Sequence, residues 1–431
     1  MKSTYKICTL YLVFVIASCS SSDDSAPMVI ALQNEPPLSF ELTEVADGAK
    51  GVEVTPTLSW ESAKNPKGSE VTYDLYLGTE VNPTTLFQGD INDTSFEIGD
   101  RLHLLTDYYW KVVAKDVDGK TSQSAIQKFS IRSLNIPEEP VTPIADFAPR
   151  SQHTSVVHDN RMWIIGGEDP VTENLISDVW YSSDGATWVE ATKDAAFSDR
   201  ILHTSAVFDN KIWVIGGQMV GEKKNDVWYS ADGINWDEAT DNASFSGRKG
   251  HSTLVYDNKM WVIGGKDANG FKNDVWYSSN GFEWQMATAS AEFSVVSRHA
   301  SVIFDDKMWV IGGEFESGGK RNEVWSSTDG VHWTQATKSA EFSERGWHAA
   351  AVFDNKIWII GGLGNQGEAP FENEVWYSHD GTHWAQAPVS GLFLERRPPN
   401  TAVVHHNKIW VIGEEILTSS NSAKSEVWPL D

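Results

Sequence analysis

Histidine and arginine recur at fixed positions in this 431-residue chain and are its first candidates for chemistry. Both sets precede a tryptophan that recurs about every fifty residues, the histidines by ten residues and the arginines by thirteen. A ring of imidazoles could hold a metal ion. The sets are His153, His203, His251, His299 and His348, and Arg150, Arg200, Arg248, Arg345 and Arg397.

Repeat symmetry argues against that chemistry, because it would spread these side chains around an axis instead of gathering them. Val296 breaks the arginine set in the fourth repeat, and Asn400 breaks the histidine set in the sixth. We therefore expect both sets to form structural hydrogen bonds across repeat junctions. The sequence indicates no metal site and no cofactor.

One position, two residues after the arginine, varies between repeats. Its occupants are Gln152, Leu202, Gly250, Arg298, Trp347 and Pro399. Arg298 and Trp347 stand in adjacent repeats, so we expect a cation and an indole side by side on one face. Such a pair suits sugar stacking or capture of an acidic peptide group. The alternative is that Trp347 only fills the opening of the central channel.

Further candidate ligand residues follow the glycine pair that ends each tryptophan-containing segment. They are Glu316, Lys320 and Arg321 after the fourth pair, and Asn365 and Gln366 after the fifth. Glu414 replaces the second glycine of the sixth pair and precedes Glu415. Two carboxylates could form an acid/base site, but divergence of a terminal repeat explains the same change more simply.

A repeating unit of about fifty residues must position these side chains. The first glycines of the pairs are 48 to 52 residues apart, and each unit holds four apolar runs too short for helices. Asp257-Asn258 and Asn280-Gly281 separate such runs, and both dipeptides suit tight hairpins. Four antiparallel strands per unit form one blade of a β-propeller.

Tryptophan usage supports this blade. Of 20 tryptophans, seventeen recur at three repeat positions, and Trp347 is the exception in this region. A ring in every blade favours packing between sheets over a sugar-stacking surface. The double glycine, V-W-Y and a later Trp resemble the kelch repeat, whose propellers include the central domain of galactose oxidase. The resemblance covers roughly residues 148–431 and implies an all-β, six-bladed propeller.

The turn S-x-D-G-x-x-W also resembles the sialidase Asp-box, but it lacks one residue between Asp and Trp, so the likeness is to the hairpin alone. Galactose oxidase requires copper and a cysteine–tyrosine crosslink, yet Cys8 and Cys19 are the only cysteines. The folded part therefore has no thiol chemistry and no disulfide.

The sixth repeat ends at Trp428-Pro429-Leu430-Asp431 without a fourth strand. The proline-rich linker, residues 134–147, ends in A-D-F-A-P-R, which matches the phrase A-x-F-S-x-R between repeats. We expect residues near Glu139–Thr142 to supply the missing strand. Pro140 and Pro143 are tolerated in a sheet only at an edge.

Residues 36–133 predict a separate β-sandwich. Strands are expected at Thr55–Trp60, Thr72–Gly78, Tyr108–Lys115 and Gln127–Ile131, where apolar residues alternate. The segment from Leu102 to Tyr108 resembles the tyrosine corner of fibronectin type III domains. A generic immunoglobulin-like sandwich is the alternative, and either would serve as a spacer.

The N-terminus resembles a bacterial lipoprotein signal peptide over residues 1–19, with Ile16-Ala17-Ser18-Cys19 similar to a lipobox. The resemblance implies acylation of Cys19 and a membrane anchor without a spanning helix; an ordinary cleaved signal peptide is the alternative. Residues 20–35 form a polar tether, and S-S-S-D-D resembles the acidic tract of surface-exported lipoproteins in Bacteroidota. We therefore expect a surface-exposed lipoprotein of the outer membrane.

A net charge of −26 argues against nucleic acid and anionic membrane surfaces as partners. The sequence favours a non-catalytic propeller that binds a glycan or an extracellular protein. A carbohydrate-active enzyme, similar to a sialic acid epimerase or a lyase, is one alternative, and a structural subunit of an envelope complex is another. Clustered carboxylates with a histidine in one pocket would favour the enzyme, whereas exposed aromatic residues and arginine would favour binding.

Overall fold

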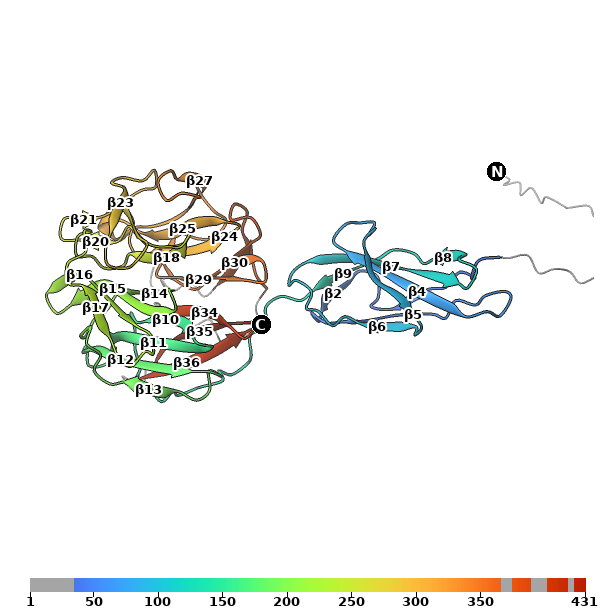
Figure 1. Cartoon of the computed structure of the whole chain (residues 1–431), viewed down its shortest axis with the longest axis horizontal. Coiled ribbons are helices and arrows are strands. Elements are labelled where there is room, and N and C mark those ends of the chain that lie inside the picture. The colour runs from blue at the N-terminus through green and yellow to red at the C-terminus, as the bar shows by residue number, and fades with distance from the viewer. Residues whose placement is uncertain (1–34, 366–373, 389–400, 418–421) are drawn as a thin grey trace, which may run out of the picture. The chain divides into compact units, whose positions relative to one another are not determined.

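The computed structural model describes residues 35–365, 374–388, 401–417 and 422–431, and nearly every element in them is a β-strand (Figure 1). The one helical turn described is η1 (Glu316–Gly318). None of these residues forms a helix long and apolar enough to cross a membrane. The predicted all-β class is therefore confirmed. The lipobox with Cys19 lies outside the described residues.

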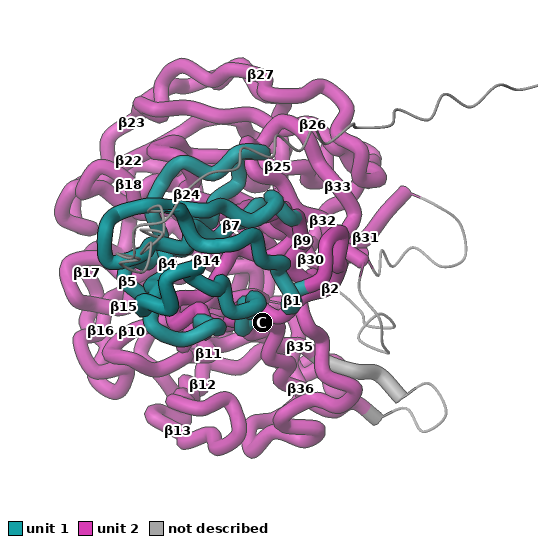
Figure 2. The backbone as a smooth tube through the Cα atoms, turned by 90° about the vertical axis from the view of Figure 1, so that its right-hand side faces the viewer, with its two compact units in different colours: residues 1–45, 57–96, 109–127 teal, residues 46–56, 97–108, 128–431 magenta. Residues whose placement is uncertain are grey.

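Internal contacts divide the chain into two compact units (Figure 2). One comprises Met1–Val45, Thr57–Phe96 and Tyr109–Gln127, and the other comprises Ala46–Pro56, Glu97–Tyr108 and Lys128–Asp431. The predicted boundary between a sandwich and a linker at residues 133 and 134 stays a prediction.

The N-terminal strands form two sheets. In the first sheet the strands follow the order β1 (Leu42–Glu44), β3 (Thr57–Trp60) and β6 (Ser95–Glu97). In the second sheet the order is β2 (Ala49–Val52), β9 (Gln127–Ile131), β7 (Asp107–Asp116), β4 (Val71–Gly78) and β5 (Leu86–Ile91). A further strand, β8 (Thr121–Gln123), pairs with β7. The alternating residues Tyr73, Leu75 and Leu77 of β4 are buried. The Tyr108 hydroxyl accepts a hydrogen bond from the His103 N–H at 3.2 Å, the type of contact that a tyrosine corner makes.

Six further sheets are the blades of a propeller. The first three are β10 (Thr154–His158), β11 (Arg161–Glu168), β12 (Leu175–Ser182) and β13 (Val189–Thr192); β14 (Thr204–Phe208), β15 (Lys211–Met219), β16 (Glu222–Ser230) and β17 (Asp237–Thr240); and β18 (Ser252–Tyr256), β19 (Lys259–Ile263), β22 (Val275–Ser278) and β23 (Gln285–Thr288). A small hairpin, β20 (Lys266–Asp267) with β21 (Gly270–Phe271), extends the third.

The other three blades follow the same order. They are β24 (Ala300–Phe304), β25 (Lys307–Glu314), β26 (Lys320–Ser327) and β27 (Thr334–Thr337); β29 (Ala349–Phe353), β30 (Lys356–Ile360), β32 (Val375–Ser378) and β33 (Ala385–Gln386); and β34 (Thr401–His405), β35 (Lys408–Leu417) and β36 (Ser422–Leu430). Short strands β28 (Arg345–Gly346) and β31 (Leu363–Gly364) join blades four and five.

The first strand of every blade lies around the central axis. β10 contacts both β14 and β34, so the ring of first strands is closed (Figure 1). Each first strand turns into the second through a two-residue hairpin with positive φ at both positions, as the sequence predicted: φ is 48° at Asp257 and 54° at Asn258.

The core lies between neighbouring blades. The second-strand tryptophan Trp213 is 1% exposed, and its indole N–H donates to the Phe208 carbonyl at 2.9 Å. Its ring packs on Gly281 in the turn between the third and fourth strands of the next blade, where an added Cβ would overlap the indole. The repeated tryptophan and the repeated turn glycine therefore form a single packing contact, which recurs between neighbouring blades.

Residues 141–145 run beside β36, where blade six needs a fourth strand. The Val141 N–H donates to the Val427 carbonyl at 3.0 Å, and the Val427 N–H donates to the Thr142 carbonyl at 3.1 Å. The Ala145 N–H donates to the Ser425 carbonyl at 3.1 Å. Segments almost 300 residues apart in sequence thus share one blade.

Candidate functional site

The described repeat arginines are structural. Arg248 is fully buried, and its two terminal nitrogens bond the Asp274 carboxylate at 2.8 and 2.9 Å. Nη1 also donates to the Gly264 carbonyl at 2.8 Å. The acidic partner, two residues before the third-strand tryptophan, was missed in the sequence, although D-V-W recurs there. The equivalent pairs are Arg150–Asp178, Arg200–Asp226 and Arg345–Glu374.

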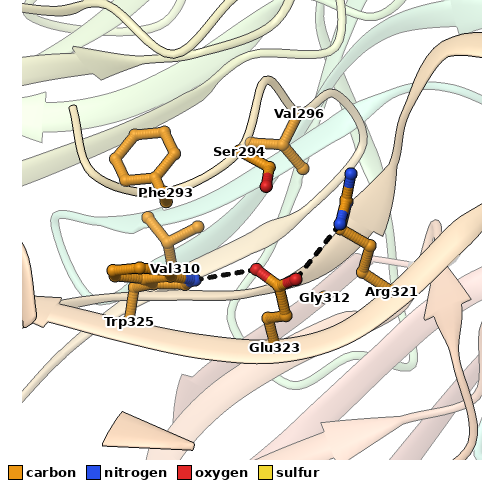
Figure 3. A pocket seen from close by; sticks show the side chains of 8 residues that line it. All are labelled: Phe293, Ser294, Val296, Val310, Gly312, Arg321, Glu323 and Trp325. Atoms are coloured by element: carbon orange, nitrogen blue, oxygen red, sulfur yellow. Dashed lines mark hydrogen bonds and ion pairs between the residues drawn. The ribbon is translucent and has the colours of Figure 1, made fainter. Parts of the chain in front are cut away.

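Blade four replaces this pair with another (Figure 3). Val296 occupies the arginine position, and the Glu323 carboxylate accepts hydrogen bonds from Trp325 Nε1 and Arg321 Nη1, each at 3.1 Å. Arg321 was expected in a ligand-binding loop, but it lies in β26 and pairs with Glu323. The reason is that β25 and β26 remain paired as far as Glu314 and Lys320, which shortens the loop between them.

Lys320 and Asn365 connect two neighbouring blades. The Lys320 N–H donates to Asn365 Oδ1 at 2.9 Å, and Asn365 Nδ2 donates to Glu344 Oε2 at 2.6 Å. Lys320 begins β26 and Glu316 lies in η1, and neither lines the cavity described below. Gln366 lies outside the described residues. Of the described candidates, Glu316, Lys320, Arg321 and Asn365 are not among the residues that line the cavity with Arg298 and Trp347.

Glu414 lies in a strand that differs from the other second strands. Its backbone pairs with Ser425 in an unshifted register, whereas β25 shifts register between Ile311 and Gly313 at its glycine pair. The second strand of blade six therefore lacks the bulge that the glycine pair produces in blades one, two and four.

The repeat histidines bridge blades through hydroxyl groups. His251 Nε2 lies 2.9 Å from Thr204 Oγ1 of the preceding blade. The equivalent pairs are His203–Thr154, His299–Ser252 and His153–Thr401. Burial lowers the pKa of His203 to about 3, with a smaller contribution from the Arg200 charge, so the imidazole is neutral at physiological pH. Within the described ranges, no three His, Cys, Asp or Glu side chains are arranged to hold a metal ion.

The variable position forms a hydrogen-bonded arc that we call the collar: Gln152, Leu202, Gly250, Arg298 and Trp347. All five residues have φ between 54° and 63°. Each N–H after the first donates to the carbonyl of the preceding member, at 3.3, 2.9, 2.7 and 2.9 Å along the chain. Pro399, the sixth occupant, lies outside the described residues. A bulky side chain at positive φ costs about 1–2 kcal/mol, so the collar holds Arg298 and Trp347 in a strained conformation.

The collar and the five repeat histidines line a cavity of about 180 Å³ at the end of the channel. The Arg298 guanidinium carbon lies 3.9 Å from the centroid of the Trp347 ring. Arg298 Nη1 also bonds Glu314 Oε2 at 2.6 Å. The two residues thus lie side by side, as the sequence predicted, whereas the role of Glu314 was missed. Its position directly after a glycine pair, beside the collar, was the available signal.

A family model described as the KLHDC2/KLHL20/DRC7 Kelch-repeats domain matches residues 116–313 and 203–414, which together exceed half of the chain. The chain belongs to the kelch-repeat family. A solved structure titled "Structure of YjhT" is similar to this kelch propeller with a TM-score of 0.55 and 17% sequence identity, over 67% of this chain and 96% of that one. At this identity the likeness shows the fold alone. No curated protein matches the chain.

The kelch assignment confirms the predicted propeller and supports a binding or scaffold role in general terms. The collar distinguishes this chain's blades from one another, since a different residue occupies the variable position in each repeat. In blades four and five that position carries a cation and an indole, which share one cavity wall.

Proposed function

We propose that this kelch propeller is a non-catalytic binding module of a bacterial outer-membrane lipoprotein, and that it binds a glycan or an extracellular protein at the channel mouth. The observation that carries the proposal is the stacked pair of Arg298 and Trp347 in the wall of a cavity. Aromatic and arginine side chains at the centre of a concave surface dominate the binding energy of many interfaces.

The backbone at these residues does not require their large side chains. Trp347 has φ of 63° and Arg298 has φ of 54°, a region that bulky residues rarely adopt. Gly250 occupies the same position in blade three, so the fold itself requires no large side chain there. Gln152 and Leu202 share this φ, so what distinguishes blades four and five is the chemistry of the Arg298 and Trp347 side chains.

The composition of the cavity favours binding over catalysis. Its described lining contains arginine, tryptophan, glutamine and histidines, and none of these described residues is a carboxylate. Acid/base chemistry on a sugar requires a positioned acid and base. The arginine and the tryptophan in this lining support binding over the epimerase-like or lyase-like alternative.

The test uses Trp347→Ala and Arg298→Ala, with ligands taken from a glycan and peptide array. We expect each variant to bind at least tenfold more weakly, about 1.4 kcal/mol, with an unchanged melting temperature. Phe282→Ala is the control, because Phe282 is an exposed ring in a turn between third and fourth strands and does not line the cavity. Unaltered affinity in the collar variants, or a large fall in their melting temperature, would contradict the proposal.

A further inference from the structure

Two lysines lie opposite each other beside the collar in blade three. Lys249 directly precedes the collar residue Gly250, and Lys266 directly follows a glycine pair. The Lys249 N–H donates to the Lys266 carbonyl at 3.1 Å, and the Lys266 N–H donates to the Lys249 carbonyl at 2.9 Å. Directly opposite residues of an antiparallel pair share one face, where like charges destabilise the pairing. The repeat does not require two cations there, since the equivalent pairs are Ser151–Glu168, Ile201–Gln218 and Ser297–Glu314.

A third lysine, Lys223 of β16, lies near this pair. It is directly opposite Gln218 of β15, and Gln218 Oε1 accepts a hydrogen bond from Lys249 Nζ. Burial lowers the pKa of Lys249. The positive charges of Arg298, Lys223 and Lys266 lower this pKa further. The three half-buried lysines, which we call the lysine cluster, therefore span the junction of blades two and three within electrostatic reach of the collar.

No carboxylate among the described residues forms an ion pair with the lysine cluster. The nearby carboxylates already have cationic partners. These pairs are Asp267–Lys272 at 3.0 Å, Glu222–Lys224 at 2.9 Å and Glu314–Arg298 at 2.6 Å. Three ammonium groups are thus gathered at one junction without a counterion from the described chain.

Neutral groups hold two of these ammonium groups in place. Lys249 bonds the amide oxygen of Gln218, and Lys266 Nζ lies 4.6 Å from the centroid of the Phe271 ring. An ammonium group has three donors, and neither an amide oxygen nor an aromatic ring cancels its charge. The lysine cluster is therefore positioned by the fold while it retains the capacity to bond an anion from outside.

The acidic character of the whole chain does not prevent anion binding at this junction. The net charge is −26, but at physiological ionic strength exposed charges more than about 8 Å apart are largely screened. An anion at the junction therefore interacts mainly with the lysine cluster. The three lysines come from different backbone segments, and neighbouring strands are about 4.8 Å apart. Charges spread in this way suit a polymer with repeated anionic groups better than a single small anion.

We propose that the lysine cluster binds the carboxylate or sulfate groups of an acidic polysaccharide. A sugar polymer is favoured over an acidic peptide because the indole of Trp347, in the same collar, offers a flat surface to the C–H face of a sugar ring. This inference rests on the proposed function and specifies that its glycan ligand is acidic.

Lys249→Gln and Lys266→Gln test the lysine cluster, because each removes one charge and keeps a polar side chain. We expect each variant to bind the acidic polysaccharide about threefold to fivefold more weakly. Its melting temperature should be unchanged or higher, since the like-charge pair is relieved. Raising the NaCl concentration from about 50 to 200 mM should weaken binding more in the parent chain than in either variant.

The matched control is Lys307→Gln, which removes the same charge from the opposite end of β25 to Glu314. Because that distance exceeds the screening length, we expect the affinity of this variant to stay within about twofold of the parent.

Titration calorimetry on the full chain would use oligogalacturonate as the carboxylate probe and dextran sulfate as the sulfate probe. Methyl-esterified oligogalacturonate and dextran are their neutral counterparts, and poly-L-glutamate is the acidic peptide. Tighter binding of an acidic glycan than of its neutral counterpart, weakened in Lys249→Gln and Lys266→Gln, supports the inference. The acidic probe that binds more tightly then identifies the anionic group.

Equal affinity in the lysine variants and the parent, or an equal loss in Lys307→Gln, overturns the site. Preference for a neutral glycan or for poly-L-glutamate, or binding of none of these probes, overturns the ligand class. In each of these cases the proposed function survives if an array ligand depends on Trp347 and Arg298, and it fails if none does.

Discussion

The repeat histidines show how a basic side chain becomes part of a protein interior. His203 is buried, and its Nε2 lies 3.1 Å from the Thr154 hydroxyl of the preceding blade. Because the charged form is poorly solvated there, the pKa of His203 falls to about 3. The same burial lowers the pKa of His153 to about 3 and that of His299 to about 4.

These pKa values predict that acid destabilises the propeller. Above the ordinary histidine pKa of about 6.5, both folded and unfolded chains are neutral at these positions, so the histidines add no pH dependence. As pH falls below that value, the unfolded chain takes up protons that the folded chain cannot bind until pH approaches 3. Each buried histidine therefore removes about 1.4 kcal/mol of unfolding free energy per pH unit in this window.

His203→Asn tests this account with a residue that the chain already uses, since Asn400 stands at the same position in the sixth repeat. Urea unfolding at pH 6.5 and pH 5 should show a smaller acid-induced loss of stability in the variant than in the parent, by about 2 kcal/mol. His332→Asn is a comparison of opposite sign: Asp329 raises the pKa of the exposed His332, so removing this imidazole should not reduce the acid-induced loss of stability. An identical pH dependence in His203→Asn and the parent would contradict the neutral, buried imidazole.

At the scale of the element, blade packing depends on a turn glycine against a tryptophan. Gly281 has φ of 81° and lies against the Trp213 ring of the preceding blade. The equivalent contacts are Gly185 with Trp410, Gly233 with Trp163, Gly330 with Trp261 and Gly381 with Trp309. A side chain at this position would separate two sheets, so the glycine serves both the turn and the interface.

Gly281→Ala should lower the unfolding free energy by about 2–5 kcal/mol. Positive φ accounts for about 1–2 kcal/mol, and overlap with Trp213 accounts for about 1–3 kcal/mol. Gly221→Ala is the matched control, because Gly221 has φ of 78° but no atom within 4 Å of an added Cβ. For Gly221→Ala, denaturant unfolding should show only the loss of about 1–2 kcal/mol that a side chain at positive φ causes. Equal losses in the two variants would mean that the tryptophan contact contributes nothing.

The elements were largely predictable because periodicity and turn dipeptides are local signals. The hairpins at Asp257-Asn258 and Asn280-Gly281 and the side-by-side placement of Arg298 and Trp347 all followed from repeat spacing. The partners of the arginines, such as Asp274, did not, since pairing between distant strands depends on register. Arg321 was assigned to a loop because nothing in the amino-acid composition indicates that the backbone pairing between β25 and β26 continues past the glycine pair.

At the scale of the whole molecule, the propeller is closed by residues from before its first repeat. Residues 141–145 pair with β36, and Phe147 packs on Trp188 at 5.1 Å between ring centroids.

The proposed attachment to the membrane is testable independently of the fold. Cys19→Ser should prevent both incorporation of labelled palmitate and cleavage by lipoprotein signal peptidase, because the thiol is the acylation site that the lipobox resemblance implies. Labelling and fractionation of whole cells would measure both effects. Cys8→Ser is the control and should be processed normally. Undiminished labelling of Cys19→Ser would end the lipoprotein proposal.

The central claim is that the ligand occupies the cavity at the channel mouth. A crystal structure of the chain with the tightest-binding ligand from the array tests it most directly. We predict ligand density inside this cavity, in contact with the Arg298–Trp347 pair. Density on the outer edge of a blade or in the N-terminal sheets, with the cavity holding only water, would contradict the account.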